Sequence, residues 1–323
     1  MSKHGRIKLI TGTTHPELAK RVAKELGVRL VKTDIGFFDD GELFARVNGN
    51  VRESDLFFIG SLHAHHGANS ILETGLLLDC ISNSAERITG MFTWIGYAKQ
   101  DRAKPREALS FRVLAKIINT YGFDQIVFFD LHNLTSAGMF DVRNFHIYFM
   151  RLLIEEFNRR KLTNVVIGSP DEGSTKRART IALLTNQSEI CIVSKAHDPE
   201  TKEVDFSKSL MSSNSKGISG KNIWIWDDMI QSGRTIMAAV RIIKQAGANK
   251  ITVAAVHPDF TPGALELIAD SPVDEVIVVD TIPHTNQAEW PSKITVIDPA
   301  PFIADCIKLI HTGGRLSPLF LQY

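Results

Sequence analysis

The chain has 323 residues, of which 44% are hydrophobic, enough apolar material for two ordinary cores. Its 37 basic and 36 acidic residues leave a net charge of +1, so the composition gives no reason to expect nucleic acid or an anionic membrane as a partner. Cys80, Cys191 and Cys306 lie far apart without a zinc or disulfide spacing, and no signal peptide or membrane-spanning run is recognisable. We therefore expect a soluble, cytoplasmic protein of two domains.

Short apolar runs alternate with helical patterns through the first half of the chain. A strand at residues 7–11 is followed by a helix that has Pro16 in its first turn and ends at Gly27. This alternation predicts an α/β fold with a largely parallel sheet. The further strands predicted here are residues 28–33, 43–47, 56–60, 88–95 and 126–129, with a helix over 69–81.

Two charged turns stand out in this half. Residues 36–42 place an aromatic pair beside three acids in a glycine-bounded turn, where Phe38 could stack on a purine. Residues 97–102 place Lys99, Gln100 and Arg102 directly after a strand, where cations could neutralise phosphates. An ordinary hairpin turn and an ordinary charged loop remain the alternatives.

Acidic and imidazole side chains follow the next two strands. Asp130 and His132 share one face at the end of the strand 126–129, where α/β proteins place ligands. Asp171 follows the strand at 165–168 and could complete an oxygen-rich Mg²⁺ site. For His132 the alternative is a structural histidine without a ligand.

A long polar stretch separates two further strands. The strand at residues 189–194 ends at Lys195, and residues 196–220 are charged and serine-rich. Such an excursion inside a compact domain is either disordered or a mobile flap. In a flap, Lys195 would stand where it can meet a transferring phosphoryl group.

Residues 221–237 combine a strand, an acidic pair, a small-residue turn and a helix start. The apolar run 223–226 ends on Asp227 and Asp228, whose oxygens can accept hydrogen bonds from a sugar diol. Residues 232–235, Ser-Gly-Arg-Thr, then open a helix whose N-terminal N–H groups favour a phosphate. The segment resembles the phosphoribosyl-binding loop of the phosphoribosyltransferase superfamily. A solvated turn and an ordinary helix entry are the alternatives.

Six segments together resemble the ribose-phosphate pyrophosphokinase family, also called phosphoribosyl pyrophosphate synthetase. They occur in the family's order over nearly the whole chain, whereas an ordinary phosphoribosyltransferase would carry only the last of them. The segments are residues 36–42, 97–102, 130–132, 169–173, Lys195 and 227–235.

The resemblance implies two tandem phosphoribosyltransferase-like domains, each a mainly parallel sheet flanked by helices. We expect them at residues 1–155 and 156–304, with the segment from about 305 to 323 packing on the first. The implied enzyme is a ribose-phosphate diphosphokinase, a transferase that moves the pyrophosphate of ATP to the anomeric hydroxyl of ribose 5-phosphate with Mg²⁺. The products are phosphoribosyl pyrophosphate and AMP, for nucleotide biosynthesis. The family also implies a homo-oligomer built from dimers, hexameric in most relatives.

The resemblance assigns roles residue by residue. The ATP-binding residues would be Phe38, Asp40, Glu42, Lys99, Gln100 and Arg102, with the loop of the first three usually reaching ATP in a neighbouring subunit. The ribose 5-phosphate site would comprise Asp227, Asp228, Ser232, Gly233, Arg234 and Thr235. His132 and Asp171 would serve the metal and the phosphates, and Lys195 and His197 would be catalytic.

Four positions depart from the family pattern. Gln231 replaces an acid and Arg234 adds a cation, so the phosphate loop is expected to be more positive. Lys99 stands where Arg is usual and loses the bidentate fork. His197 replaces a permanent cation with a group that titrates near neutrality.

Two other functions are open at this point. A non-catalytic regulatory homologue would be expected to lose Lys195 or the acidic pair, and the chain keeps both. A base-specific phosphoribosyltransferase would explain the wording Ser-Gly-Arg-Thr but leaves the N-terminal half without a role. Phosphate or ADP regulation, the range of diphosphoryl donors and the number of subunits do not follow from the sequence.

Overall fold

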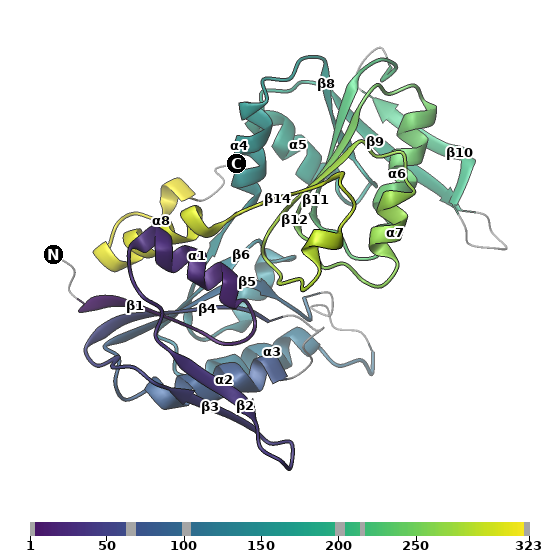
Figure 1. Ribbon diagram of the computed structural model, residues 1–323. Helices are drawn as coiled ribbons and strands as arrows, with labels where there is room; N and C mark the ends of the chain where they lie inside the picture. Colours follow the sequence, from purple (N-terminus) through teal and green to yellow (C-terminus); the bar gives the residue numbers. More distant parts are fainter. Residues whose placement is uncertain (1–3, 63–68, 99–104, 198–203, 214–216, 320–323) are drawn as a thin grey trace. The chain divides into compact units, whose positions relative to one another are not determined.

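The computed structural model describes residues 4–62, 69–98, 105–197, 204–213 and 217–319; within these, the side chains of residues 195–197 and 204–213 and of Pro318 are not described (Figure 1). The chain divides into two compact units. Unit 1 comprises residues 1–148, 281–283 and 298–322, and unit 2 comprises residues 149–280 and 284–297 together with residue 323. The last helix of the chain therefore belongs to unit 1. No helix among the described residues has the length and apolarity needed to cross a membrane.

Unit 1 is built on a five-stranded parallel sheet with the order β1-β4-β5-β6-β7. The helices α1 and α8 lie side by side on one face, and α2 and α3 cover the other (Figure 1). A separate antiparallel ribbon is formed by β2 and β3. The strands are β1 (Arg6–Thr11), β2 (Thr33–Phe37), β3 (Leu43–Val47), β4 (Ser54–Leu62), β5 (Arg87–Ile95), β6 (Gln125–Phe129) and β7 (Arg143–Ile147). The helices are α1 (Pro16–Leu26), α2 (Asn69–Ile81), α3 (Ser110–Asn119) and α8 (Ala300–Thr312), with 3₁₀ turns η2 (Leu134–Met139) and η4 (Ser317–Leu319).

Both faces of this sheet are apolar, as a parallel sheet between two helical layers requires. Alternate residues such as Phe58, Phe92 and Phe128 pack in one core with Leu114 of α3. Gly27 ends α1 in the left-handed conformation, at φ 66°, which glycine adopts without a steric penalty. The predicted helix over residues 69–81 is confirmed by α2.

Unit 2 carries a seven-stranded sheet with the order β10-β9-β8-β11-β12-β13-β14, parallel except for β10. Helices α4 and α5 lie on one face, and α6 and α7 lie on the other (Figure 1). The strands are β8 (Val165–Ser169), β9 (Ile190–His197), β10 (Val204–Ser213), β11 (Asn222–Met229), β12 (Ile251–His257), β13 (Glu275–Val279) and β14 (Ile294–Ile297). The helices are α4 (Met150–Arg159), α5 (Thr175–Leu184), α6 (Arg234–Gln245) and α7 (Ala264–Ala269), with a 3₁₀ turn η3 (Gln287–Glu289).

The strand β11 is buried on both faces and anchors this sheet. Ile223 and Ile225 pack in one core with residues of α6. Trp224 and Trp226 face the opposite side, and their rings lie 4.9 and 6.0 Å from the ring of Phe157 in α4. Burying two Trp and two Ile side chains contributes several kcal/mol, which holds the end of this strand in place.

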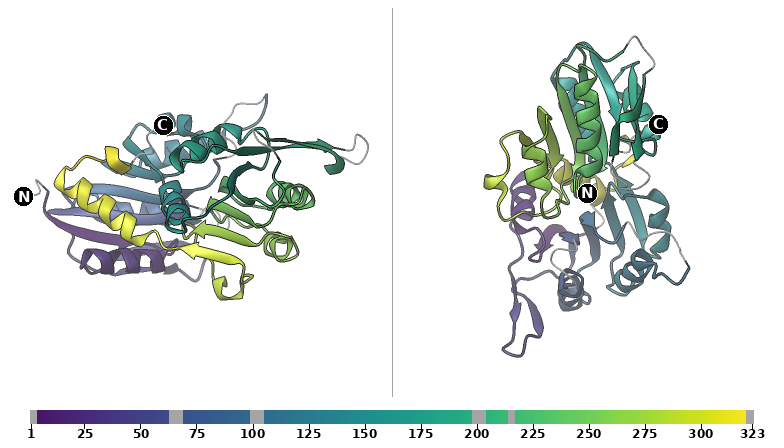
Figure 2. Two further views of the ribbon diagram at one scale, coloured as in Figure 1. Left: turned by 90° about the horizontal axis from the view of Figure 1, so that it is seen from above. Right: turned by 90° about the vertical axis from the view of Figure 1, so that its right-hand side faces the viewer.

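The predicted strands differ from the structure at two places. Residues 28–33 do not form a strand: the segment makes a single bridge, from Leu30 to Leu9, before the chain continues into β2. The strand that was predicted to end at Lys195 continues to His197 and pairs with β10, a strand that was not predicted (Figure 2). Val204 and Phe206 alternate there with polar residues, which is the two-residue period of a strand. The connecting residues 198–203 lie outside the described part of the chain.

The cysteines are free thiols. Cys191 and Cys306 are buried, and burial raises the pKa of the Cys191 thiol to about 12, so this group stays protonated. Cys80 is exposed, and its sulfur lies 3.6 Å from the carbonyl oxygen of Ala45, to which the S–H donates.

A buried charge network connects α8 to the sheet of unit 1. Asp55 in β4 is fully buried and accepts two hydrogen bonds from Arg87, at 2.8 and 2.6 Å. The ring nitrogen Nδ1 of His311 in α8 lies 2.7 Å from the same carboxylate, and Arg87 also donates to the carbonyl oxygen of Ile310. Burying these charges is tolerable only because each has a partner.

We predict that Arg87→Met lowers the free energy of unfolding by about 3–5 kcal/mol, because it leaves a buried carboxylate without its guanidinium. The measurement is chemical denaturation. Arg159→Met, which removes an exposed ion pair with Glu156, is the control and should have little effect. A loss in Arg87→Met no larger than in the control would show that the network does not stabilise unit 1.

Candidate functional site

The predicted phosphate loop lies between the end of β11 and the start of α6. The N–H of Ile230 donates to the carbonyl oxygen of His257 at 2.9 Å, which keeps the loop beside the end of β12. Gly233 precedes α6 with φ 69°, a conformation that is costly for other residues. Helix α6 begins directly afterwards at Arg234. The first N–H groups of a helix have no acceptor within the helix and can bind an anion at its N-terminal end.

Ser232 in this loop is half-buried, whereas Arg234 and Thr235 are exposed. The loop thus combines backbone donors, two hydroxyls and one permanent cation on a single helix start. These are the groups that bind a phosphate monoester.

The acidic pair at the end of β11 is held by a guanidinium from α5. Arg177 forms ion pairs with Asp227 and, at 3.1 Å, with Asp228. The N–H of Asp228 donates to Oδ1 of Asp227 at 2.9 Å. Burial raises the pKa of Asp227 to about 7, and Asp228 adds to this rise, whereas Arg177 opposes it.

Gln231, one of the departures from the family pattern, has a partner of its own. Its side-chain N–H₂ donates to the carboxylate of Asp259, which is buried, and its backbone carbonyl oxygen accepts the N–H of Thr261 at 3.3 Å. The expectation that losing an acid at position 231 makes the loop more positive is therefore incomplete. A carboxylate is still present beside the loop, supplied by the segment after β12.

Asp171 lies in the turn between β8 and α5. Its Oδ1 accepts the N–H of Ser174 at 2.9 Å, and its carbonyl oxygen accepts the hydroxyl of Ser169 at 2.7 Å. The residue thus has a local role in shaping the turn before α5.

His132 is exposed in the turn after β6. The preceding Asp130 is buried and has φ 48°, an uncommon conformation outside glycine. The N–H of Leu131 donates to Nε2 of His146 at 2.9 Å. Burial lowers the pKa of His146 to about 4, so its ring is neutral at pH 7 and can accept this bond.

His132 belongs to unit 1 and Asp171 to unit 2. Within the described ranges, no group of three or more His, Cys, Asp or Glu side chains is arranged to hold a metal ion.

The turn between β2 and β3 presents an aromatic ring to solvent. Phe38 is 58% exposed, and its ring centroid lies 5.0 Å from that of Phe44. The N–H of Phe38 donates to the carbonyl oxygen of Glu42, and the N–H of Glu42 donates to the carboxylate of Asp40 at 3.0 Å. These contacts define the turn and leave the face of the ring accessible.

The other predicted residues are only partly described. Lys99, Gln100 and Arg102 lie outside the described residues. Lys195 and His197 lie in β9, but their side chains are not described.

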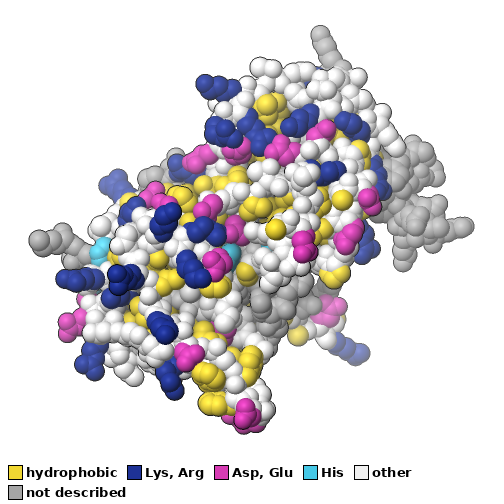
Figure 3. Space-filling view, viewed as in Figure 1, with side chains coloured by type: hydrophobic (Ala, Val, Ile, Leu, Met, Phe, Trp, Pro, Cys, Tyr) yellow, Lys and Arg dark blue, Asp and Glu magenta, His cyan; other side chains and the backbone are white. Residues whose placement is uncertain are grey.

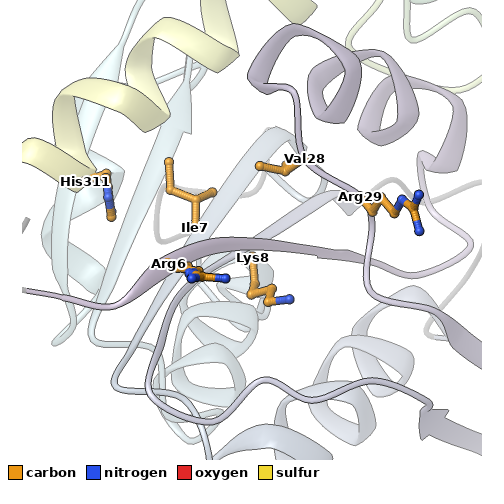
Figure 4. Close-up of a pocket in the computed structure, with 6 residues that line it drawn as sticks. All are labelled: Arg6, Ile7, Lys8, Val28, Arg29 and His311. Carbon is orange, nitrogen blue, oxygen red and sulfur yellow. The ribbon is translucent and has the colours of Figure 1, made fainter.

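Basic and acidic side chains are interspersed on the face shown in Figure 3, as the small net charge suggests. An open hollow of ≈ 550 Å³ in unit 1 lies along β1 and contains none of the predicted site residues. The Arg29 side chain points away from Arg6 and Lys8, so these cations do not converge on one point (Figure 4). The residues that line the hollow are Arg6, Ile7, Lys8, Val28, Arg29 and His311.

Three residues that contact the predicted site were not singled out from the sequence. Arg177 lies in the cationic run Lys-Arg-Ala-Arg of residues 176–179, and Asp259 follows Pro258, but neither pattern indicates which acid or amide these side chains contact. His146 lies in β7, a strand that the sequence did not reveal.

We predict that Gln231→Asp destabilises unit 2 by about 1–3 kcal/mol at neutral pH, because it places a carboxylate against buried Asp259. One acid of this pair would have a pKa raised above its unfolded value. The deficit should therefore be small below about pH 4 and grow as the pH rises through the folded pKa. Gln231→Asp with Asp259→Asn restores a donor–acceptor pair and should recover stability. Equal deficits in the single and double variants, measured by denaturation at pH 4 and 8, would contradict the assignment.

The regions that match known proteins cover almost the whole chain. Residues 7–122 match the N-terminal domain of ribose phosphate pyrophosphokinase, and residues 213–321 match the phosphoribosyl synthetase-associated domain. Ribose-phosphate pyrophosphokinase of Shewanella oneidensis is 33% identical over 317 residues, which cover 97% of this chain and 98% of the relative. The enzyme of that name from Corynebacterium efficiens is also 33% identical, over 98% of this chain and 96% of its own length.

A solved structure gives the same result. Phosphoribosylpyrophosphate synthetase from Mycobacterium smegmatis superposes with a TM-score of 0.84 at 31% identity, over 96% of this chain and 100% of the other. The predicted fold class, two mainly parallel sheets flanked by helices, is confirmed. Because the matched domains and the full-length relatives agree, the chain belongs to the ribose-phosphate pyrophosphokinase family.

Proposed function

We propose that the protein transfers the pyrophosphate group of ATP to the anomeric hydroxyl of ribose 5-phosphate, forming phosphoribosyl pyrophosphate and AMP. The observation that carries this proposal is the end of β11, where an acidic pair and a phosphate loop follow one another within a chain that matches the family over 97% of its length. The hydroxyl oxygen attacks the β-phosphorus, the bond from that phosphorus to the α-phosphate oxygen breaks, and the hydroxyl proton is released.

Ribose 5-phosphate is assigned to unit 2. The 5-phosphate binds the backbone N–H groups and hydroxyls of residues 232–235, with Arg234 adding a cation. Asp227 and Asp228 accept hydrogen bonds from the ribose hydroxyls, which orients the sugar. The position of Gly233 as the residue directly before α6 supports this assignment, since a glycine leaves room for a phosphate beside the first turn of the helix.

ATP is assigned to residues of unit 1. Phe38 stacks on adenine, and Asp40 and Glu42 bind near it; the exposed ring at the tip of the β2–β3 ribbon supports this role. Lys99, Gln100 and Arg102 contact the nucleotide through hydrogen bonds and charge. In a homo-oligomer, which we also propose, the ribbon would reach the ATP of a neighbouring subunit.

Mg²⁺ is the metal that we propose, held by His132, Asp171 and the substrate phosphates. Magnesium keeps most of its waters and takes only one or two protein ligands beside phosphate oxygens. The carboxylate of Asp171 is an oxygen donor of the kind that magnesium prefers. When bound, the ion would neutralise charge on the phosphates.

We assign Lys195 as the catalytic residue that stabilises the migrating β-phosphoryl group. His197 is assigned as a second catalytic residue. Phosphoryl transfer needs positioning and charge stabilisation rather than a protein nucleophile, since the sugar hydroxyl itself attacks. Both residues belong to β9, which pairs with β10 at the edge of the sheet in unit 2.

The first test separates nucleotides after incubation with ATP, ribose 5-phosphate and Mg²⁺. AMP should appear in step with phosphoribosyl pyrophosphate, and only when the sugar phosphate is present. ADP in place of AMP would mean that the γ-phosphoryl group moves and would overturn the proposal. Unchanged nucleotide with ATP still bound would instead indicate a regulatory homologue.

Lys195→Ala should lower kcat by about 100- to 1000-fold, the loss typical of removing one group that stabilises transition-state charge. Lys308→Ala, which removes an exposed lysine in α8, is the control. Near-normal turnover in Lys195→Ala, in the same AMP assay, would remove Lys195 from the mechanism.

Phe38→Ala should raise KM for ATP by about five-fold or more, because a stacked base is worth about 1–3 kcal/mol. Phe37→Ala is the matched control, since that ring is also 58% exposed on the same ribbon. Equal effects of the two substitutions on KM would contradict a specific contact between Phe38 and adenine.

A further inference from the structure

Arg177 is placed where it can control the acidic pair. It lies in the first turn of α5, and this helix packs against β8 and β11. Its Nη1 contacts Asp227 and its Nη2 lies 3.1 Å from Oδ1 of Asp228, so a single planar guanidinium bridges both carboxylates. The three side chains are only 29%, 17% and 13% exposed, which limits screening by water.

The pair needs such a partner because it consists of two adjacent carboxylates in a poorly hydrated place. Burial and the neighbouring Asp228 both favour protonation of Asp227, and Arg177 opposes this. A protonated carboxyl becomes a donor at one oxygen, whereas the ionised form accepts at both. Accepting oxygens are what a sugar diol requires.

Among the described residues, the strands that pair with β11 bring no second Lys or Arg beside the acidic pair. Along β12, Ala255 pairs with Asp227, and the next titratable side chain, His257, pairs with Met229. On the other side, β8 pairs with β11 only as far as Ile225. Arg234 at the start of α6 is exposed to solvent.

We propose that Arg177 is the positioning residue of the acidic pair, holding both carboxylates in one orientation and favouring their accepting, ionised form before the sugar arrives. The inference rests on the proposed function, because it assumes that the pair binds the ribose hydroxyls. It assigns to α5 a role in sugar recognition. A merely structural ion pair would contribute to stability without changing how sugar binding depends on pH.

The test compares Arg177→Gln and Arg177→Lys with the wild type. KM for ribose 5-phosphate, KM for ATP and kcat are measured between pH 6 and 9.5. In the wild type, KM for the sugar should fall as the pH rises through about 7, where Asp227 becomes ionised. Without the guanidinium the carboxylate ionises at higher pH, so in Arg177→Gln this fall should shift upward by one pH unit or more.

At pH 7 the expected rise in KM for the sugar in Arg177→Gln is about five-fold or more, with recovery towards pH 9 and little change in KM for ATP. Arg177→Lys keeps the charge but loses the fork, so it should raise KM at every pH without shifting the profile. Arg179→Gln is the matched control, because Arg179 is exposed on the same helix two residues further along. It should leave both KM values unchanged.

Two outcomes would overturn the inference. One is an unchanged KM for the sugar in Arg177→Gln, and the other is a rise by the same factor at every pH. If Arg177→Gln does not fold, Arg177→Lys carries the test. An Arg177→Lys enzyme whose KM for the sugar equals the wild-type value at every pH would contradict a positioning role of the guanidinium.

The proposed function and the role of Arg177 can be tested independently of each other. Calorimetric binding of ribose 5-phosphate does not require turnover, so its pH dependence tests Arg177 even if no AMP is formed. Absence of AMP in the wild type with an intact shift of sugar binding in Arg177→Gln would reject the reaction and keep the inference.

Discussion

The pairing of β11 between β8 and β12 is the constraint on which the candidate site of unit 2 depends. Its apolar residues are buried on both faces of the sheet. A shift of the strand by one position would move Trp224 and Trp226 to the opposite face, where the core is packed for Ile223 and Ile225. That register carries Asp227 and Asp228 to the end of the strand. Hydrophobic burial thus decides where two carboxylates lie, and the cost of burying them decides that a cation must face them.

Unit 1 applies the same physical rule to a different purpose. Asp55 is fully buried in β4, and its charge is balanced by Arg87 from β5 and contacted by His311 from the last helix. There the buried carboxylate connects segments that are distant in the sequence. Helix α8 comes after residues 149–297 and packs beside α1, near the start of the chain. In both units a charge inside the fold is found with partners from separate elements.

The phosphate loop shows how a departure from a family pattern can be balanced elsewhere. Gln231 stands where the family resemblance implies an acid, and in isolation this suggests a loss of negative charge. In the fold, Gln231 donates to Asp259, so a carboxylate still lies beside the loop, reached from the neighbouring strand β12. Arg234 remains an added cation, and the local field reflects both changes rather than either alone.

The sequence by itself determined the fold class, the family, the position of α2 and most strands, and the order of strand, acids, turn and helix from 221 to 237. These features are readable because they depend on local periodicity, on backbone conformation and on motifs that are contiguous in the chain. Only the tertiary structure decided that Arg177 faces an acid fifty residues away, that Gln231 contacts Asp259, and that β10 completes a ribbon with β9. Such contacts depend on the order of strands in the sheet, which no local pattern encodes.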